Sequence, residues 1–279
     1  MKKNFQIEII RSLNDINKNL EKINKSETSI KKSFSNGLLE WSQEENQFLN
    51  IKHQNSNVFD NLLFLENQKN ILINNTVQFL EGKPSNSVLL WGARGTGKSS
   101  LVISAYNALI KKFSFSMIEI KFFQIEFMPK ILRLLEKKKN KIIIFCDDFS
   151  FESNDEKFIL YKNILEGSLR RNPNIIFYVT SNYRHLVRNN FNDDINGSHN
   201  KDTNENLISL SDRFGIWLGF HSFNKEEFIK IVLFYANYFK LRLKPDLIKR
   251  KAIQWSILRG SYSGREAINF IKFLLLEKI

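Results

Sequence analysis

Short apolar runs alternate with segments of helical character along residues 87–220 of this 279-residue chain. Strands that alternate with helices form βαβ units, and these units build a parallel sheet that is buried on both faces. The predicted strands are SVLLW at 87–91, FSMIEI at 115–120, KIIIFC at 141–146, NIIFYVT at 174–180 and GIWLGF at 215–220. We therefore expect an open α/β sheet of five parallel strands.

Helical segments are predicted on the N-terminal side of this sheet. Apolar residues recur at steps of three and four over residues 9–23, which places them on one face of a helix. The repeat is too short for a coiled coil, so docking on the chain's own core is the preferred interpretation. A polar linker is expected at residues 26–37. A second helix should begin near Leu62 and end before Gly82 and Pro84.

The C-terminal part of the chain has a different pattern. Residues 189–206 are too polar to be buried and are predicted to form a surface loop. Residues 224–279 read as helices, with breaks near Pro245 and over residues 260–264. The predicted domains are an N-terminal helical region with linker at 1–50, an α/β nucleotide-binding core at 51–222 and a helical lid at 223–279.

The chain is basic, with 42 Lys and Arg against 29 Asp and Glu and a net charge of +13. Such a charge favours a polyanionic partner, either nucleic acid or an acidic membrane surface. The basic residues are scattered rather than gathered in one stripe, and a composition rich in Lys and Asn can arise without selection for binding. Solvated lysine is therefore the preferred interpretation, and contact with nucleic acid is left open.

No targeting or membrane signal stands out in the sequence. The basic start of the chain is not followed by an unbroken apolar stretch, and no apolar run approaches transmembrane length. The single cysteine, Cys146, lies in an apolar run and is expected to be a small core residue. These features predict a cytoplasmic protein without a membrane span.

The segment GARGTGKS at residues 92–99 fits the G-x-x-x-x-G-K-[ST] phosphate loop, and it lies between a predicted strand and a predicted helix. Its glycines let the backbone curl so that amide groups point at phosphate oxygens. Lys98 should meet the β and γ phosphates, and Ser99 should ligate Mg²⁺. The alternative is a glycine-rich turn without a ligand. The predicted ATP contacts in this loop are Gly92, Ala93, Arg94, Gly95, Thr96, Gly97, Lys98, Ser99 and Ser100.

Two adjacent acids, Asp147 and Asp148, follow a predicted buried strand. The carboxyl ends of parallel strands form the edge at which ligands bind. Asp147 is expected to hold Mg²⁺ through water, and Asp148 to orient or deprotonate the water that attacks the phosphate. Glu152 is a second candidate for this base. Two solvated acids at a strand end are the alternative.

Three further polar residues are candidates because of where they lie in the pattern. Asn182 ends the fourth predicted strand, where it could face a phosphate or cap a following helix. Arg213 precedes the fifth strand and is a candidate for contact with a phosphate. The alternative is a pair with Asp212 at the surface. Arg265 lies in the first turn of a helix that starts at Ser263, where it could simply be solvated.

These motifs occur in the order found in AAA+ ATPases, over residues 62–279. The chain most resembles an uncharacterised bacterial family of predicted AAA+ ATPases, a domain of unknown function. The segments that carry this resemblance are NQKNILINNTVQFLEG, LLWGARGTGKSSLV, FCDDFSFE, TSNYRHL and LSDRFGIWLGF.

The resemblance implies a sheet with strand order 5-1-4-3-2, ATP and Mg²⁺ between core and lid, and a ring or partial ring of identical subunits. It also implies roles for three residues. Asn182 resembles the sensor 1 residue, Arg213 the arginine finger that reaches a neighbouring subunit, and Arg265 the sensor 2 residue. The usual Asp-Glu pair of the family is Asp-Asp here, which keeps both Asp148 and Glu152 open as the base.

The expected function is an ATPase motor or switch that acts on an unknown protein client. A nucleic-acid-associated ATPase of the loader type would share this chemistry, and stimulation by DNA or RNA would distinguish it. A P-loop kinase is the third candidate, but it would need a small-substrate pocket and an arginine-rich lid.

Overall fold

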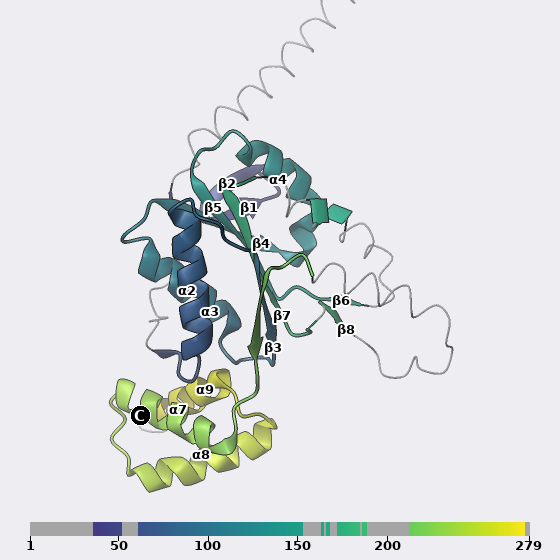
Figure 1. The fold of residues 1–279 in the computed structure, drawn as a ribbon. Helices are drawn as coiled ribbons and strands as arrows, with labels where there is room; N and C mark the ends of the chain where they lie inside the picture. The colour runs from purple at the N-terminus through teal and green to yellow at the C-terminus, as the bar shows by residue number, and fades with distance from the viewer. Residues whose placement is uncertain are drawn as a thin grey trace, which may run out of the picture.

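A sheet of seven strands forms the centre of the protein, in the order β2-β1-β4-β5-β7-β3-β9 (Figure 1). Neighbouring strands are parallel except for β1 and β2, which form an antiparallel pair. The strands are β1 (Leu38–Ser42), β2 (Gln47–Asn50), β3 (Val88–Gly92), β4 (Phe115–Lys121), β5 (Lys141–Asp147), β7 (Ile175–Ser181) and β9 (Ile216–Phe220). A separate two-stranded sheet pairs β6 (Phe151–Glu152) with β8 (Val187–Arg188).

The computed structural model describes part of the chain. The described residues are 36–51, 61–152, 163–164, 166–167, 172–184, 186–188 and 212–276. The helix predicted over residues 9–23, most of the linker predicted at 26–37 and the loop predicted at 189–206 lie outside them.

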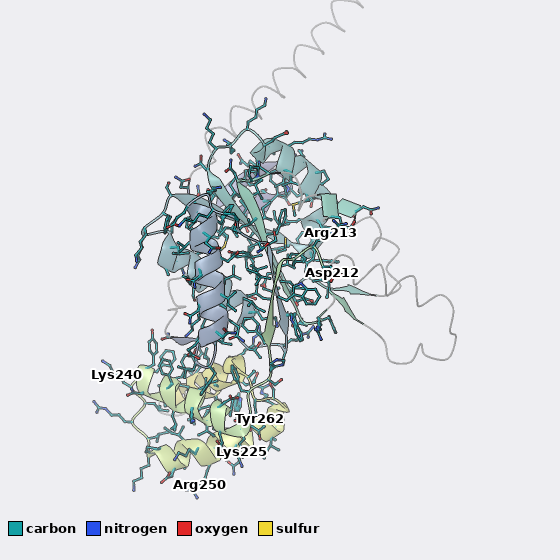
Figure 2. All side chains as sticks on the ribbon, in the orientation of Figure 1. Asp212, Arg213, Lys225, Lys240, Arg250 and Tyr262 are labelled. Carbon is teal, nitrogen blue, oxygen red and sulfur yellow. The ribbon has the colours of Figure 1, made fainter. Side chains whose placement is uncertain are left out.

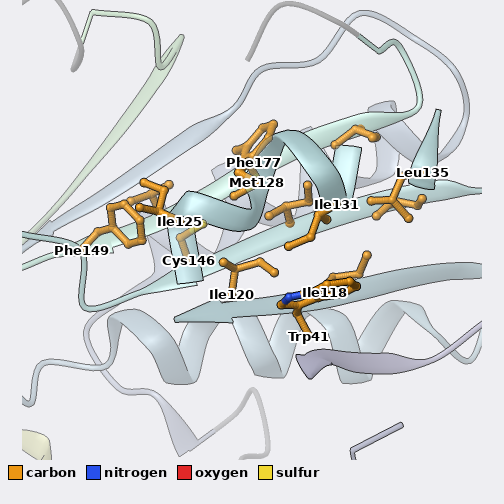
Figure 3. Close-up of a cluster of buried hydrophobic side chains, with 14 of the residues drawn as sticks. Trp41, Ile118, Ile120, Ile125, Met128, Ile131, Leu135, Cys146, Phe149 and Phe177 are labelled. Atoms are coloured by element: carbon orange, nitrogen blue, oxygen red, sulfur yellow. The ribbon is translucent and has the colours of Figure 1, made fainter. Parts of the chain in front are cut away.

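Helices cover both faces of the sheet. On one face, α2 (Glu66–Leu80) and α3 (Lys98–Leu109) pack on the strands, and on the other lie η2 (Phe122–Phe127) and α4 (Met128–Leu135) (Figure 1). Successive strand residues alternate between the two cores, because side chains of a strand point to opposite faces. Val88 and Leu90 join the α2–α3 side, whereas Leu89 joins the α4 side. Figure 3 shows the α4-side core, which includes the buried thiol of Cys146.

The prediction of a five-stranded parallel sheet was wrong, because β1 and β2 extend the sheet beyond β4. The five predicted strands themselves follow one another as β9-β3-β7-β5-β4 within the larger sheet. Residues 38–50, which the prediction placed in an N-terminal helical region and linker, therefore belong to the sheet. Their side chains Leu39, Trp41 and Phe48 are buried in the α4-side core. Two short runs joined by a polar turn give only a weak strand signal, so the hairpin is recognisable only from its pairing with β4.

Three helices follow the last strand: α7 (Lys225–Tyr238), α8 (Pro245–Arg259) and α9 (Gly264–Leu276). They share a hydrophobic core of their own and lie beyond the carboxyl ends of the strands (Figure 1). Asn224 and Glu227 form a capping box at the start of α7. Pro245 begins α8, and Gly260 ends it in a left-handed conformation, so the predicted helix breaks are confirmed. We call these three helices the lid.

None of the helices among the described residues is long and apolar enough to cross a membrane.

Candidate functional site

The phosphate loop joins β3 to α3 at the carboxyl edge of the sheet, as the motif predicted. Its glycines are required for steric reasons. At Gly92 the backbone φ is 132°, and a Cβ atom would lie 2.0 Å from the carbonyl oxygen of Phe220. At Gly95 φ is 72°, a left-handed conformation that costs other residues free energy. The loop therefore keeps a curled shape that a side chain would disrupt.

Lys98 folds back over this loop. Its buried Nζ donates hydrogen bonds to the carbonyl oxygens of Gly92 and Ala93, both at 2.8 Å. It also donates to Oδ1 of Asn182 at 3.2 Å. The ammonium group is thus held at the mouth of the loop, with three oxygen partners that a phosphate could replace.

The environment of Lys98 has mixed electrostatics. Burial lowers the pKa of its ammonium group to about 8. The negative charges of Asp148 and Asp147 oppose this shift, and the positive charges of Arg265 and Arg94 add to it. Charged groups of both the core and the lid therefore act on the ammonium group of Lys98.

Asp147 ends β5 and gathers two hydroxyl groups. Its Oδ1 accepts hydrogen bonds from Oγ of Ser99 and from Oγ1 of Thr180, both at 2.5 Å. Thr180 also accepts a hydrogen bond from the backbone N–H of Asp148 at 2.8 Å, so it holds the two-acid turn in place. Thr180 was not among the predicted site residues, although its place at the end of the next strand was a usable signal.

The adjacent Asp148 has a different setting. It is exposed, with a left-handed backbone (φ 52°), and its Oδ1 accepts a hydrogen bond from Nδ2 of Asn182 at 2.6 Å. Asp148 therefore turns away from the Ser99–Asp147 pair and faces Asn182. Glu152, the other candidate base, lies in β6 outside the main sheet.

Asn182 joins the two halves of the site, since its amide contacts both Lys98 and Asp148. The alternative role, capping a helix, is not supported. The described residues that follow Asn182 contain no helix and lead into β8 (Val187–Arg188).

The lid reaches the phosphate loop through the start of α9. The backbone N–H of Arg265 donates a hydrogen bond to the carbonyl oxygen of Gly95 at 3.2 Å. Oγ of Ser263 accepts from the N–H of Glu266 at 3.2 Å, which is half of the predicted capping box. The Glu266 carboxylate instead accepts from Nε1 of Trp255 at 2.9 Å. The start of α9 thus places Arg265 next to the phosphate loop.

A cavity of about 580 Å³ lies between the sheet edge and the lid. Its polar wall contains residues 94–100 of the phosphate loop together with Asp147, Asp148, Asn182 and Arg265. The rest of the lining, which we call the apolar wall, is largely apolar. This wall, which the sequence did not predict, is formed by Leu62, Leu63, Leu65, Phe223, Ile231, Tyr235, Tyr238, Phe239 and Ile268.

Arg213 lies elsewhere. It is exposed just before β9, and it is not among the residues that line the cavity. Figure 2 shows Arg213 on the side of the sheet away from the lid. No ion pair joins Arg213 to Asp212, although the structure describes both residues. Arg213 therefore cannot contact a ligand in the cavity of its own subunit.

The donor set suits a magnesium ion held together with a nucleotide. Mg²⁺ prefers oxygen ligands and is usually bound by one or two carboxylates together with substrate phosphates and water. Ser99 and Asp147 present such oxygens within hydrogen-bond distance of each other. The described residues contain no group of three or more His, Cys, Asp and Glu side chains that would bind a metal ion without a nucleotide.

Comparison with solved structures identifies the fold. The protein resembles the Holliday junction branch migration motor RuvB of Thermotoga maritima, with 17% sequence identity and a TM-score of 0.52. The matched region covers 77% of this chain and 63% of the RuvB chain. A DNA replication initiation factor is 16% identical, with a TM-score of 0.52, and the match covers 80% of this chain and 65% of that one. The Orc1 protein of Aeropyrum pernix, solved in complex with DNA, is 15% identical, with a TM-score of 0.54, and the match covers 76% of this chain and 61% of that one. The chain thus spans less than two thirds of the length of each.

A comparison with curated protein sequences gives no match. A family described as "Protein of unknown function (DUF815)" matches residues 35–278, which include every predicted site residue. The protein therefore belongs to this family of unknown function, and its fold is that of the AAA+ ATPases.

Proposed function

We propose that the protein binds ATP with Mg²⁺, hydrolyses it, and uses the cycle to move the lid against a macromolecular partner. The observation that carries this proposal is the convergence of Lys98, Asp147, Asp148, Asn182 and Arg265 on one cavity between the sheet and the lid. These residues come from four separate stretches of the chain. Their types are those that phosphoryl transfer requires, namely cations, a metal-binding carboxylate and a group that orients water.

The apolar wall of the cavity supports a nucleotide as the ligand. Tyr235, Phe223 and Ile231 provide a surface for a flat base, while residues 94–100 offer backbone amides and cations to the phosphates. A volume of about 580 Å³ lies within the usual range for small-molecule sites. One cavity therefore offers both environments that a nucleoside triphosphate needs.

Each polar residue has a role that its contacts allow. Lys98 would exchange its carbonyl partners for the β and γ phosphates, and Ser99 and Asp147 would hold Mg²⁺. When bound, Mg²⁺ neutralises part of the phosphate charge. Asp148 is exposed to the cavity and would accept a proton from the attacking water, and Asn182 would keep Asp148 oriented.

Replacement of Lys98 tests this proposal. Lys98→Ala removes the buried cation, so ATP binding should weaken and turnover should fall to background, as measured with a fluorescent ATP analogue and by phosphate release. Lys112→Ala is the matched control, because Lys112 is an exposed lysine just beyond the same helix. Normal hydrolysis by a folded Lys98→Ala protein would overturn the assignment.

A second candidate is an ATPase that works on nucleic acid. It is favoured by the three solved structures above, each of which is described by its role in DNA transactions or by its complex with DNA. This candidate predicts that DNA or RNA raises the rate of ATP turnover, and that added salt abolishes the increase. A rate that nucleic acid does not change would leave a protein client as the partner.

A further inference from the structure

The lid carries more positive charge than the α/β core. Residues 223–279 contain 12 Lys and Arg against 5 Asp and Glu, a net charge of +7. Residues 36–222 contain 22 against 20, a net charge of +2 in a stretch more than three times as long. A bias towards lysine across the whole sequence would charge both parts in proportion. Relative to the core, the lid therefore has an excess of cations that a uniform bias in composition does not explain.

Helix stability explains the acidic residues of the lid but not the basic ones. The four acidic residues that the structure describes there are Glu226, Glu227, Asp246 and Glu266, and all lie in the first turn of a helix. Negative charge at that position stabilises the helix dipole. Positive charge does so in the last turn, where α7 and α9 have no basic residue and α8 has only Arg259.

Several of the basic residues lie along the chain where α7 passes into α8. Lys240, Arg242 and Lys244 lie in the connection, and Arg250 follows in α8; all four are exposed. We call these four residues the basic corner. Figure 2 shows Lys240 and Arg250 projecting outward from the lid helices.

Two other lid cations, Lys249 and Arg259, have acidic partners. Lys249 lies 3.4 Å from Asp246, and Arg259 lies 3.8 Å from Glu266 and 4.9 Å from the ring of Trp255. Within the described part of the chain, no ion pair involves Lys240, Lys244 or Arg250. The charges of these three side chains are therefore available to a partner.

Lys240 also occupies a backbone position that favours glycine. Its φ is 53°, and it follows the last turn of α7, where glycine commonly ends a helix. A lysine in this conformation is strained, whereas Gly260 fills the matching position after α8. The strain supports a role for the Lys240 side chain beyond ending the helix.

Two partly exposed aromatic residues of the apolar wall, Tyr238 and Phe239, directly precede the basic corner in the chain. Tyr238 is 49% exposed and Phe239 is 38% exposed, and their ring centroids are 5.1 Å apart. Exposed rings next to cations are typical of surfaces that bind nucleic acid, because bases stack on the rings while the cations contact phosphates. The exposed aliphatic residues Ile257 and Leu258 lie near the C-terminal end of α8, outside the basic corner.

We propose that the basic corner binds the phosphodiester backbone of nucleic acid. The inference goes beyond the ATPase chemistry and does not depend on it, because none of the four side chains belongs to the phosphate loop or the acid cluster. Contact there would couple nucleic acid to the lid, the element whose α9 contacts the phosphate loop at Gly95.

The test compares two triple variants of the full chain. One carries Lys240→Gln, Arg242→Gln and Lys244→Gln. The control carries Lys137→Gln, Lys138→Gln and Lys139→Gln, which removes the same charge just beyond α4, at the opposite end of the molecule from the lid (Figure 1). Fluorescence anisotropy would measure binding to a short duplex DNA, to one of its single strands and to the same sequence as RNA, at several salt concentrations.

The corner variant should bind at least about tenfold more weakly than wild type at low salt, and its salt slope on duplex DNA should fall by about 0.9 for each lost phosphate contact. The control should retain most of the affinity and the slope. Lys240→Arg with Lys244→Arg should bind like wild type, because the charge is kept. The relative affinities for the three probes would identify the kind of nucleic acid.

Two results would overturn the proposal. One is an equal loss of affinity in both triple variants, which would indicate diffuse attraction by the total charge. The other is binding through the corner to vesicles of phosphatidylserine and phosphatidylcholine but to none of the three nucleic acids. The corner variant should still bind the ATP analogue, and Lys98→Ala should still bind nucleic acid, so failure of this proposal is distinguishable from failure of the ATPase assignment.

Discussion

Asp147 and Asp148 are adjacent in the chain, yet their hydrogen-bond partners differ. Asp147 accepts two hydroxyl hydrogen bonds, from Ser99 and Thr180, and so lies beside the Ser99 hydroxyl with which we propose it holds a metal ion. Asp148 has a left-handed backbone that turns its side chain towards Asn182 and the cavity. The change of backbone direction between them separates the proposed metal ligand from the proposed base.

Exchanging each acid for its amide should separate the two roles. Asp148→Asn keeps a similar shape and should retain ATP while turnover falls, because the amide cannot accept the proton of water. Asp147→Asn should weaken Mg²⁺-dependent binding of ATP, because the metal loses its carboxylate. Equilibrium binding with and without Mg²⁺, together with phosphate release, would measure both effects. Normal turnover by Asp148→Asn with an inactive Glu152→Gln would assign the base to Glu152.

Arg184 is a second residue whose position suggests influence on the site. Its guanidinium carbon lies 5.4 Å from the ring centroid of Trp91 and 6.0 Å from that of Trp217. Trp91 directly precedes the phosphate loop, and Arg184 lies two residues after Asn182. The stack therefore joins the strand that carries the loop to the segment that carries Asn182.

We predict that Arg184→Met lowers the turnover number about 2- to 5-fold with little change in the KM for ATP, because an exposed cation–π contact contributes about 0.5–1 kcal/mol. Arg184→Lys should recover part of the loss, since the cation is kept. Steady-state kinetics of the three proteins would check this. A change confined to KM would show that Arg184 affects nucleotide binding rather than the position of Asn182.

At the scale of elements, the contact between lid and phosphate loop depends on glycine at position 95, which has no side chain. A Cβ atom at Gly95 would lie 2.9 Å from Oγ of Ser263 and 3.1 Å from Cβ of Arg265. The lid can thus approach the loop closely enough for the Arg265 N–H to reach the Gly95 carbonyl oxygen. The position of the lid and the shape of the loop therefore depend on each other at Gly95.

Gly95→Ala should therefore displace the start of α9 and weaken ATP binding by about tenfold or more, since the loop is strained and the lid contact is lost. Gly82→Ala is the matched control, because Gly82 also has a positive φ of 75° but nothing lies within 4 Å of its added Cβ. The control should lose about 1 kcal/mol of unfolding free energy and keep its affinity for ATP. Equal affinities in the two variants would contradict this account of the lid contact.

The β1–β2 hairpin is the other element with a testable role. It covers the edge of β4, and its side chains Leu39, Trp41 and Phe48 are almost completely buried. Removal of residues 1–35 should leave a folded protein that binds ATP, whereas removal of residues 1–50 should give an unstable or insoluble one. The reason is that loss of one large core side chain alone costs about 3–5 kcal/mol. Thermal unfolding and ATP binding of both truncations would decide the point, and a stable chain without the hairpin would contradict it.

On the scale of the whole molecule, the position of Arg213 determines whether this residue could act only between neighbouring subunits. It lies outside the cavity of its own subunit, so any role in catalysis requires the cavity of a neighbour. Stabilisation of a transferred phosphoryl group by such an arginine raises the rate by about 10³ to 10⁵. A chain that uses it would be a weak ATPase as a monomer.

We predict that specific ATPase activity rises with protein concentration, and that Arg213→Ala binds ATP nearly normally but hydrolyses it poorly. A mixture with Lys98→Ala should recover activity, because the intact Arg213 of one mutant can complete the intact phosphate loop of the other. Arg265→Ala should instead weaken ATP binding, because Arg265 lines the cavity of its own subunit. Turnover independent of concentration, with no recovery in the mixture, would leave a monomeric enzyme as the better description.

The sequence by itself determined the features that depend on local spacing. The phosphate loop, its preceding strand and its following helix occupy one continuous stretch, and the two acids directly follow a run of five consecutive apolar residues. The helix breaks at Pro245 and Gly260 are likewise properties of single residues. Such features can be predicted because the residues that create them are neighbours in the chain.

Only the tertiary structure decided which distant residues complete the site. Asn182 contacts Lys98 from 84 positions away in the chain, and the start of α9 contacts Gly95 from the far end of the sequence. The hairpin at the sheet edge, the apolar wall of the cavity and the second partner of Glu266 also depend on contacts between separate elements. Their energy comes from packing and desolvation, which act through space and leave no regular spacing in the sequence.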